Sequence, residues 1–134
     1  DCDVLNADGG TRTAAVTGGF VAMALAFEKL VAVSEIKSNP LRHYVAAVSV
    51  GLQGSNFLLD LDYEEDSSIS TDMNFVMTDE GKFVEVQGTA EQHPFTQEQL
   101  MGMLGMAKQG IEDLFKHQQE IVGHFFKFPT GNKA

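Results

Sequence analysis

Six carboxylates are concentrated in a stretch of thirteen residues, and this acidic run constrains the fold more than any other feature of the sequence. Residues 56–59 before the run and 73–77 after it are mostly apolar, as expected of strands. The acidic side chains are Asp60, Asp62, Glu64, Glu65, Asp66 and Asp72. Carboxylates this close together repel one another unless protons or cations intervene.

The acidic run has two interpretations. A hard divalent cation such as Mg²⁺ or Mn²⁺ prefers carboxylate oxygens and retained waters, so a metal site at the junction of two strands would use these groups. The alternative is a solvated acidic loop, because runs of charge often only solvate a surface. From the run alone, both interpretations stay open.

The chain as a whole is also acidic, with 134 residues and a net charge of −10. This charge argues against a broad basic surface for nucleic acid, since phosphate contacts need Lys and Arg. It leaves room for RNA held at a small local site together with a metal ion. With 43% hydrophobic residues, the chain can form the core of one domain.

Cysteine usage and hydropathy bear on the compartment. A single cysteine, Cys2, excludes an internal disulfide, so we expect a reducing, cytoplasmic environment. Residues 1–7 alternate loosely and predict a short strand, in which Cys2 would be a small buried hydrophobe. The most apolar run, residues 14–26, is predicted to be too short to span a bilayer, and no membrane partner is expected. The start without Met suggests cleavage or truncation.

A glycine-rich turn precedes the first predicted helix. Gly9 and Gly10 break the strand, and Thr11 and Arg12 lead into a helix over about 14–33. A strand, glycines and a helix start together present backbone N–H groups to an anion, and the guanidinium of Arg12 suits phosphate. An ordinary turn with a threonine N-cap is the alternative. The helix is apolar on most faces, which predicts that it is sandwiched between layers.

The rest of the chain predicts two hairpins and a long helix. The first hairpin pairs 44–52 with 56–63, and alternation would place Asp60 and Asp62 on one face of it. A short helical turn over 64–70 would bring Asp66 near Asp72, which opens the second hairpin of 71–78 with 82–88. Thr96 with Gln99 forms a capping box for the long C-terminal helix.

Three segments taken together resemble a known family. They are D-C-D-V-L-N-A-D-G-G-T-R-T-A-A-V-T-G, then N-P-L-R-H-Y-V-A-A-V-S-V-G-L, then L-L-D-L-D-Y-E-E-D-S-S-I-S-T-D-M-N-F-V-M-T running on into F-V-E-V-Q-G-T-A-E. Their order and content closely resemble bacterial ribonuclease PH, a phosphorolytic tRNA nucleotidyltransferase. The resemblance covers residues 1 to about 119 and concerns only the C-terminal part of the family sequence.

The resemblance implies an α+β fold like the second domain of ribosomal protein S5, with a mixed β-sheet and long helices. It implies that the N-terminal part of that fold is missing, that residues 1–124 form the C-terminal part of the domain, and that 125–134 are a frayed tail. It also implies a hexameric ring of dimers. An uncovered sheet would favour association with another copy or with a complementary N-terminal fragment.

The implied reaction is phosphorolysis, in which inorganic phosphate attacks the 3′-terminal phosphodiester of a tRNA precursor and a nucleoside diphosphate leaves. Gly10, Thr11 and Arg12 match the phosphate-binding triplet of the family. Asp66 and Asp72 match its paired aspartates, which implies binding of Mg²⁺ or Mn²⁺ and a catalytic role, with Asp72 also a candidate general acid.

Two further sets of acids and two further functions remain open. Asp60 and Asp62 are second candidates for the metal, with electrostatic support or solvent contact as the alternative, whereas Glu64 and Glu65 are expected to be solvated. A non-catalytic ring subunit or RNA-binding module is one alternative function. An inactive fragment of the parent enzyme is the other.

Overall fold

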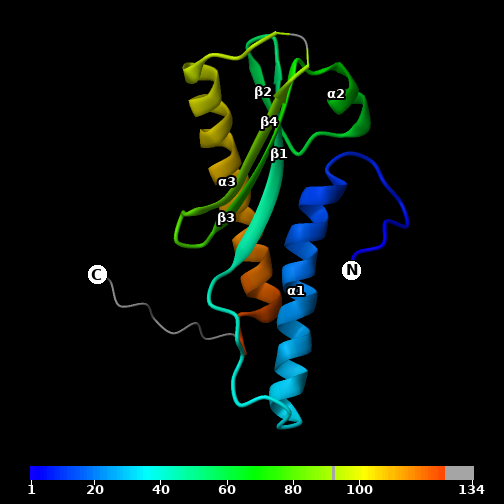
Figure 1. The fold of residues 1–134 in the computed structure, drawn as a ribbon, viewed down its shortest axis with the longest axis vertical. Helices are drawn as coiled ribbons and strands as arrows, with labels where there is room; N and C mark the ends of the chain where they lie inside the picture. The colour runs from blue at the N-terminus through cyan, green and yellow to red at the C-terminus, as the bar shows by residue number, and fades with distance from the viewer. Residues whose placement is uncertain (92, 126–134) are drawn as a thin grey trace.

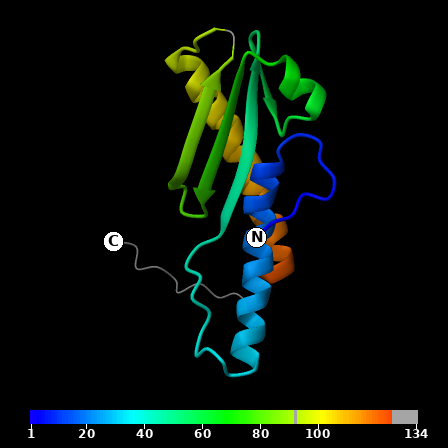
Figure 2. The same ribbon diagram turned by 45° about the vertical axis from the view of Figure 1, so that its right-hand side comes forward.

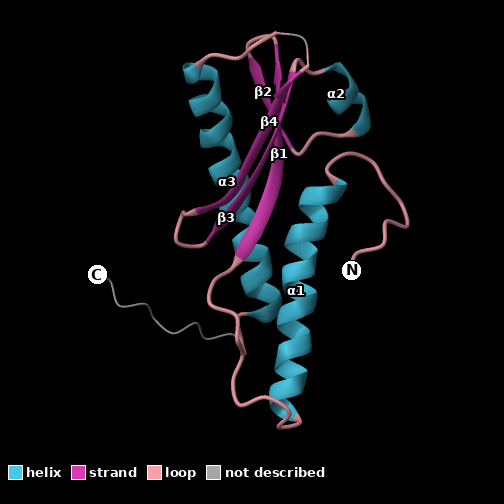
Figure 3. Ribbon diagram, viewed as in Figure 1, coloured by secondary structure: helices cyan, strands magenta, loops and turns pink. Residues whose placement is uncertain are grey.

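The computed structural model describes residues 1–91 and 93–125. In chain order the elements are α1 (Thr11–Ala32), β1 (Val45–Gln53), β2 (Asn56–Leu59), α2 (Tyr63–Ser68), β3 (Thr71–Thr78), β4 (Phe83–Ala90) and α3 (Gln97–Val122). Figure 1 shows the sheet with α3 along it, α1 beside the lower part of β1, and the short α2 near the upper end. The same elements are distinguished as helix and strand in Figure 3.

The four strands form one sheet in the order β2-β1-β3-β4. All three pairings are antiparallel, so the predicted α+β class is confirmed, whereas a parallel pair, which a mixed sheet requires, is not found among the described strands. The second hairpin closes at Gly81, whose φ of 75° suits only a residue without a side chain. The predicted strand 71–78 matches β3.

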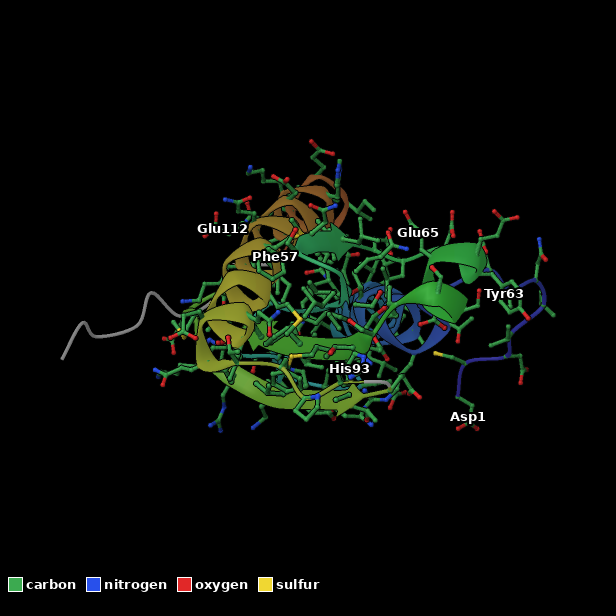
Figure 4. The ribbon with its side chains drawn as sticks, turned by 90° about the horizontal axis from the view of Figure 1, so that it is seen from above. Asp1, Phe57, Tyr63, Glu65, His93 and Glu112 are labelled. Carbon is green, nitrogen blue, oxygen red and sulfur yellow. The ribbon has the colours of Figure 1, made fainter. Side chains whose placement is uncertain are left out.

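Helix α3 covers one face of the sheet and forms the core with it (Figure 2). Its buried side chains recur at helical spacing and pack against the even-numbered residues of β1 and the odd-numbered residues of β3. The side chain of Phe57 lies between β2 and this helix (Figure 4), where a Cβ on Gly102 would come within 2.3 Å of the ring. The predicted capping box of Thr96 and Gln99 is confirmed.

Helix α1 packs on one side only, which corrects the expectation of a helix sandwiched between layers. Its buried residues are Thr13, Phe20 and Ala24, while Met23 and Leu25 are more than two-fifths exposed. The prediction that the apolar run of residues 14–26 is too short to span a bilayer is wrong on length. Helix α1, which contains this run, has 22 residues and meets the length and composition of a membrane-crossing helix.

The position of α1 is fixed by hydrogen bonds to the open edge of β1. Strand β2 pairs only with residues 50–53 of β1, so the preceding part of that edge has no strand beside it. There the hydroxyl of Thr17 accepts a hydrogen bond from the Ala47 N–H (3.0 Å) and donates one to the Ala47 carbonyl (3.3 Å). The buried Gln118 Nε2 donates to the carbonyls of Thr17 (3.1 Å) and Val45 (3.0 Å).

Two predictions about the chain ends have different outcomes. Residues 1–7 form no strand, and Cys2 is exposed with its thiol 3.8 Å from the Ala15 carbonyl, because the segment runs beside α1 and joins no sheet. The predicted frayed tail lies outside the described residues except for Phe125, which is packed against the core.

The fold predicts that Gln118→Ala lowers the free energy of unfolding by about 2–3 kcal/mol, because it opens a cavity and leaves buried carbonyls without their donor. Gln119→Ala, at the next, exposed position of the same helix, is the matched control and should change it by less than about 0.5 kcal/mol. Urea denaturation measures both. Equal effects would contradict the bridging role of Gln118.

Candidate active site

The sheet face opposite α3 is open and polar. Since Val48 and Phe75 point into the α3 core, alternation places Ser49, Asn74 and Asp72 on the opposite face. Asn74 lies opposite both Ser49 on β1 and Gln87 on β4, so the polar face extends across the sheet. We call this surface the open sheet face.

Gly51 on β1 has no side chain, and this lets the residues that flank α2 pack onto the open sheet face. A Cβ on Gly51 would lie 2.9 Å from Leu61 and 3.0 Å from Ile69, so these two side chains pack on the strand only because Gly51 has none. Leu61 and Ile69 flank α2, and Gly51 is the register partner of Asp72. The segment that carries Asp66 is therefore held beside the strand that carries Asp72.

The strand carrying the acidic run is shorter than predicted, so Asp60 and Asp62 both lie beyond its end. Strand β2 ends at Leu59, and Asp60 adopts φ 58°, a conformation that Asp tolerates better than most residues. Asp62 Oδ1 accepts the Glu65 N–H (2.8 Å) as the N-cap of α2. The prediction that Asp60 and Asp62 share a strand face is wrong for this reason.

The surroundings of Asp72 raise the pKa of its carboxyl. Partial burial raises the pKa of its carboxyl, and repulsion from Asp66 and then from Glu91 raises it further, against a hydrogen bond from Asn74 that lowers it. The repulsion supports the predicted closeness of Asp66 and Asp72. Glu91 was missed by the sequence analysis, although the pairing of Thr71 with Ala90 brings the next residue to the same end of the sheet.

The N-terminus of α1 offers free backbone donors. Gly10 is the N-cap with φ 64°, no side chain caps the helix, and no acidic residue lies in its first turn. The alternative of a threonine N-cap is therefore excluded, since the helix begins at Thr11 itself. Uncapped N–H groups at the positive end of a helix of 22 residues suit an anion.

Two adjacent residues, Asp8 and Gly9, connect this helix start to the acidic run. Asp8 Oδ1 accepts the Tyr63 N–H at the start of α2 (2.8 Å). A Cβ on Gly9 would come within 1.8 Å of the Leu61 carbonyl oxygen, so only glycine fits there. The glycine turn and the acidic run, some fifty residues apart in sequence, are thus in direct contact. Figure 4 shows Tyr63 on the outer side of α2, where its side chain is exposed.

Arg12 extends from α1 to the edge strand β4. Its NH2 group donates to Glu85 Oε2 (2.7 Å) and its NH1 group to Gln87 Oε1 (3.2 Å). The neighbouring carboxylate raises the pKa of Arg12, and the guanidinium lowers the pKa of Glu85. Sequence analysis missed Glu85 and Gln87, although alternation along the second hairpin places both on the face that carries Asn74.

The carboxylates fit a metal only in part. Within the described residues, no group of three or more His, Cys, Asp or Glu side chains is arranged to hold a metal ion. Asp66 and Asp72 remain a pair, which is the protein donor set expected for Mg²⁺ that keeps several waters and binds substrate phosphate. Asp60 lies instead beside the helix start, with its Oδ1 3.5 Å from where a Gly10 Cβ would be.

Comparison with known proteins identifies the family. The profile described as 3′ exoribonuclease family, domain 2, matches residues 43–110. The chain belongs to the 3′ exoribonuclease family. Among curated proteins it is similar to ribonuclease PH of Bdellovibrio bacteriovorus (65% identical over 127 residues, 95% of this chain and 52% of the relative). It is also similar to ribonuclease PH of Bacillus subtilis (53% over 124 residues, 92% and 51%) and of Moorella thermoacetica (55% over 133 residues, 98% and 53%).

These relatives confirm the resemblance to ribonuclease PH and the fold of its C-terminal domain. The chain spans about half the length of the curated relatives that it matches. The part of the chain that the family profile matches contains Asp66, Asp72 and both β4 partners of Arg12, whereas Arg12 precedes it.

The raised pKa of Asp72 predicts a pH-dependent effect of Asp72→Asn. The folded state holds the proton more tightly than the unfolded state, so stability falls as pH rises from the ordinary aspartate range through the raised pKa. At neutral pH the variant should therefore unfold at a higher temperature than the wild type, and the difference should vanish in acid below the ordinary range. Thermal unfolding across pH measures this.

Asp66→Asn should lower the pKa of Asp72, because it removes one repelling charge while the larger effect of burial remains. Titration of the Asp72 carboxyl by NMR measures the change. An Asp72 titration unaltered in Asp66→Asn would contradict the closeness of the two carboxylates.

The left-handed backbone at Gly10 predicts that Gly10→Ala costs about 1–2 kcal/mol of folding free energy. Gly18→Ala is the matched control, since a Cβ there meets nothing within 4 Å in the helix interior, and it should stabilise the chain by about 0.5–1 kcal/mol. Chemical denaturation measures the change in the free energy of unfolding for both variants, and the two changes should have opposite signs. A stabilising Gly10→Ala would contradict the described helix start.

Proposed function

We propose that this chain carries catalytic residues of a phosphate-dependent 3′-to-5′ exoribonuclease, which trims the 3′ ends of tRNA precursors and releases nucleoside diphosphates. The observation that supports it most is the contact between the uncapped start of α1 and the acidic run, through Asp8 and Gly9. It brings the uncapped helix terminus, where we propose the phosphate binds, against the turn that leads into α2, the helix that carries Asp66.

The start of α1 would bind the attacking phosphate. The N–H groups that follow Gly10 point along the helix axis without a capping side chain, and Thr11 adds a hydroxyl. Arg12 adds a positive charge above the open sheet face. Because phosphate is itself the nucleophile, the chain needs to orient it and to offset its charge, and needs no activated serine or cysteine.

Asp66 and Asp72 would bind Mg²⁺ or Mn²⁺, which when bound stabilises negative charge at the reacting phosphodiester. A carboxyl that binds the metal is ionised, so proton donation is an alternative role for Asp72 in place of metal binding. Its raised pKa keeps the carboxyl closer to neutral operating pH than an ordinary aspartate, which suits a general acid that protonates the leaving oxygen.

The complete site would require a partner segment or chain. The chain spans about half of each ribonuclease PH relative, and the edge strand β4 exposes Phe83, Val84 and Val86. Exposed apolar side chains on an edge strand favour association. We therefore propose that the chain works within a hexameric ring of dimers, or against a complementary N-terminal segment, in the cytoplasm.

Phosphorolysis can be tested in a chimera in which this chain replaces the matched half of the Bdellovibrio bacteriovorus ribonuclease PH. With a tRNA precursor, inorganic phosphate and Mg²⁺, the chimera should release nucleoside diphosphates, and omission of phosphate should stop the release. Asp72→Asn should lower the rate by about 100-fold or more, the usual contribution of a positioned proton donor.

Asp113→Asn is the matched control, because this exposed aspartate pairs with Lys116 on α3, away from the open sheet face. It should leave the rate unchanged. Release of nucleoside monophosphates would show hydrolysis in place of phosphorolysis, and full activity of Asp72→Asn would remove the role assigned to that residue.

A further inference from the structure

The guanidinium of Arg12 is held by two acceptors on one strand. Glu85 and Gln87 are two residues apart on β4, so their side chains leave the strand on the same face. Each accepts from a different nitrogen of Arg12, at 2.7 Å and 3.2 Å. Contacts to two nitrogens fix the plane of the guanidinium as well as the place of its charge.

We propose that Glu85 and Gln87 are positioning residues, which orient Arg12 over the open sheet face so that its remaining N–H donors bind inorganic phosphate. The proposal deepens the proposed function and rests on its phosphate site. An arginine has five N–H donors, of which these two contacts use two. The Arg12 side chain remains 52% exposed, so the other donors are accessible to an anion.

The ion pair between Arg12 and Glu85 lacks the two parallel hydrogen bonds that would stabilise it most. Arginine and a carboxylate commonly form two parallel hydrogen bonds, with both carboxylate oxygens used. Here one nitrogen bonds Gln87 instead, and Glu85 Oε1 is buried without a hydrogen-bond partner among the described residues. An orphaned buried oxygen is a cost, and it accompanies an arrangement that sets the direction of the guanidinium.

The same contacts connect Arg12 to the strand pair that carries Asp72. Gln87 is the register partner of Asn74, and Asn74 Nδ2 donates to Asp72 Oδ2 at 3.4 Å. Gln87 thus contacts Arg12 from a row of side chains that leads through Asn74 to Asp72. Glu85 offsets part of the Arg12 charge, whereas the neutral Gln87 adds a second acceptor without offsetting more of it.

The test measures the order of Arg12 and its affinity for phosphate separately. In the ¹⁵N-labelled full chain, the Arg12 Nε–H signal reports whether the guanidinium is fixed, and titration with inorganic phosphate gives the dissociation constant. Glu85→Ala and Gln87→Ala should each broaden or shift the signal toward that of a free arginine. Glu85→Ala should weaken phosphate binding about tenfold, and Glu85→Gln, which keeps an acceptor, should weaken it less.

Glu80→Ala is the matched control, since Glu80 forms an exposed ion pair with Lys82 in the same hairpin and does not contact Arg12. It should leave both readouts unchanged. Unaltered or tighter phosphate binding in Glu85→Ala, with normal binding by the wild type, would overturn the positioning role and leave the phosphate site intact. Absence of phosphate binding to the wild-type chain would overturn the site and the positioning role together.

Discussion

The open edge of β1 is the constraint on which the rest of the structure depends. Strand β2 covers only part of that edge, and buried backbone groups without partners cost free energy. Thr17 and Gln118 supply the missing hydrogen bonds from two different helices, and Gln118 also bonds the carbonyl of Thr17. These bonds fix the position of α1 along the sheet, and they thereby determine where its uncapped N-terminus lies.

From that fixed position, the start of α1 meets the acidic run. The kink at Asp60 ends β2 and turns the chain onto the open sheet face, where Gly51 leaves room for Leu61. Asp8 and Gly9 then contact the same turn, so the uncapped helix start lies against the segment that leads into α2 and Asp66. The chemistry that we propose follows from this contact more than from either motif alone, since phosphoryl transfer depends chiefly on positioning and charge.

Asp72 and Arg12 illustrate two ways in which a fold prepares charged groups. Burial and neighbouring acids raise the pKa of Asp72, which favours a retained proton. A carboxylate and an amide on β4 hold Arg12 in its charged state and fix its direction. We propose a proton-donating role for the first group and an oriented charge for the second, and both lie on the sheet face opposite α3.

The sequence by itself determined the elements that depend on local patterns. Apolar periodicity predicted α3, the capping box predicted its start, and the turn residues predicted both hairpins. The glycine turn and the acidic run were recognisable from residue type alone. Only the tertiary structure decided that β2 stops at Leu59, that Asp60 and Asp62 therefore share no strand face, and that α1 is exposed on one side. It also supplied Glu85, Gln87 and Glu91, because strand register and contacts between segments far apart in sequence bring them to the site, and no local pattern encodes such contacts.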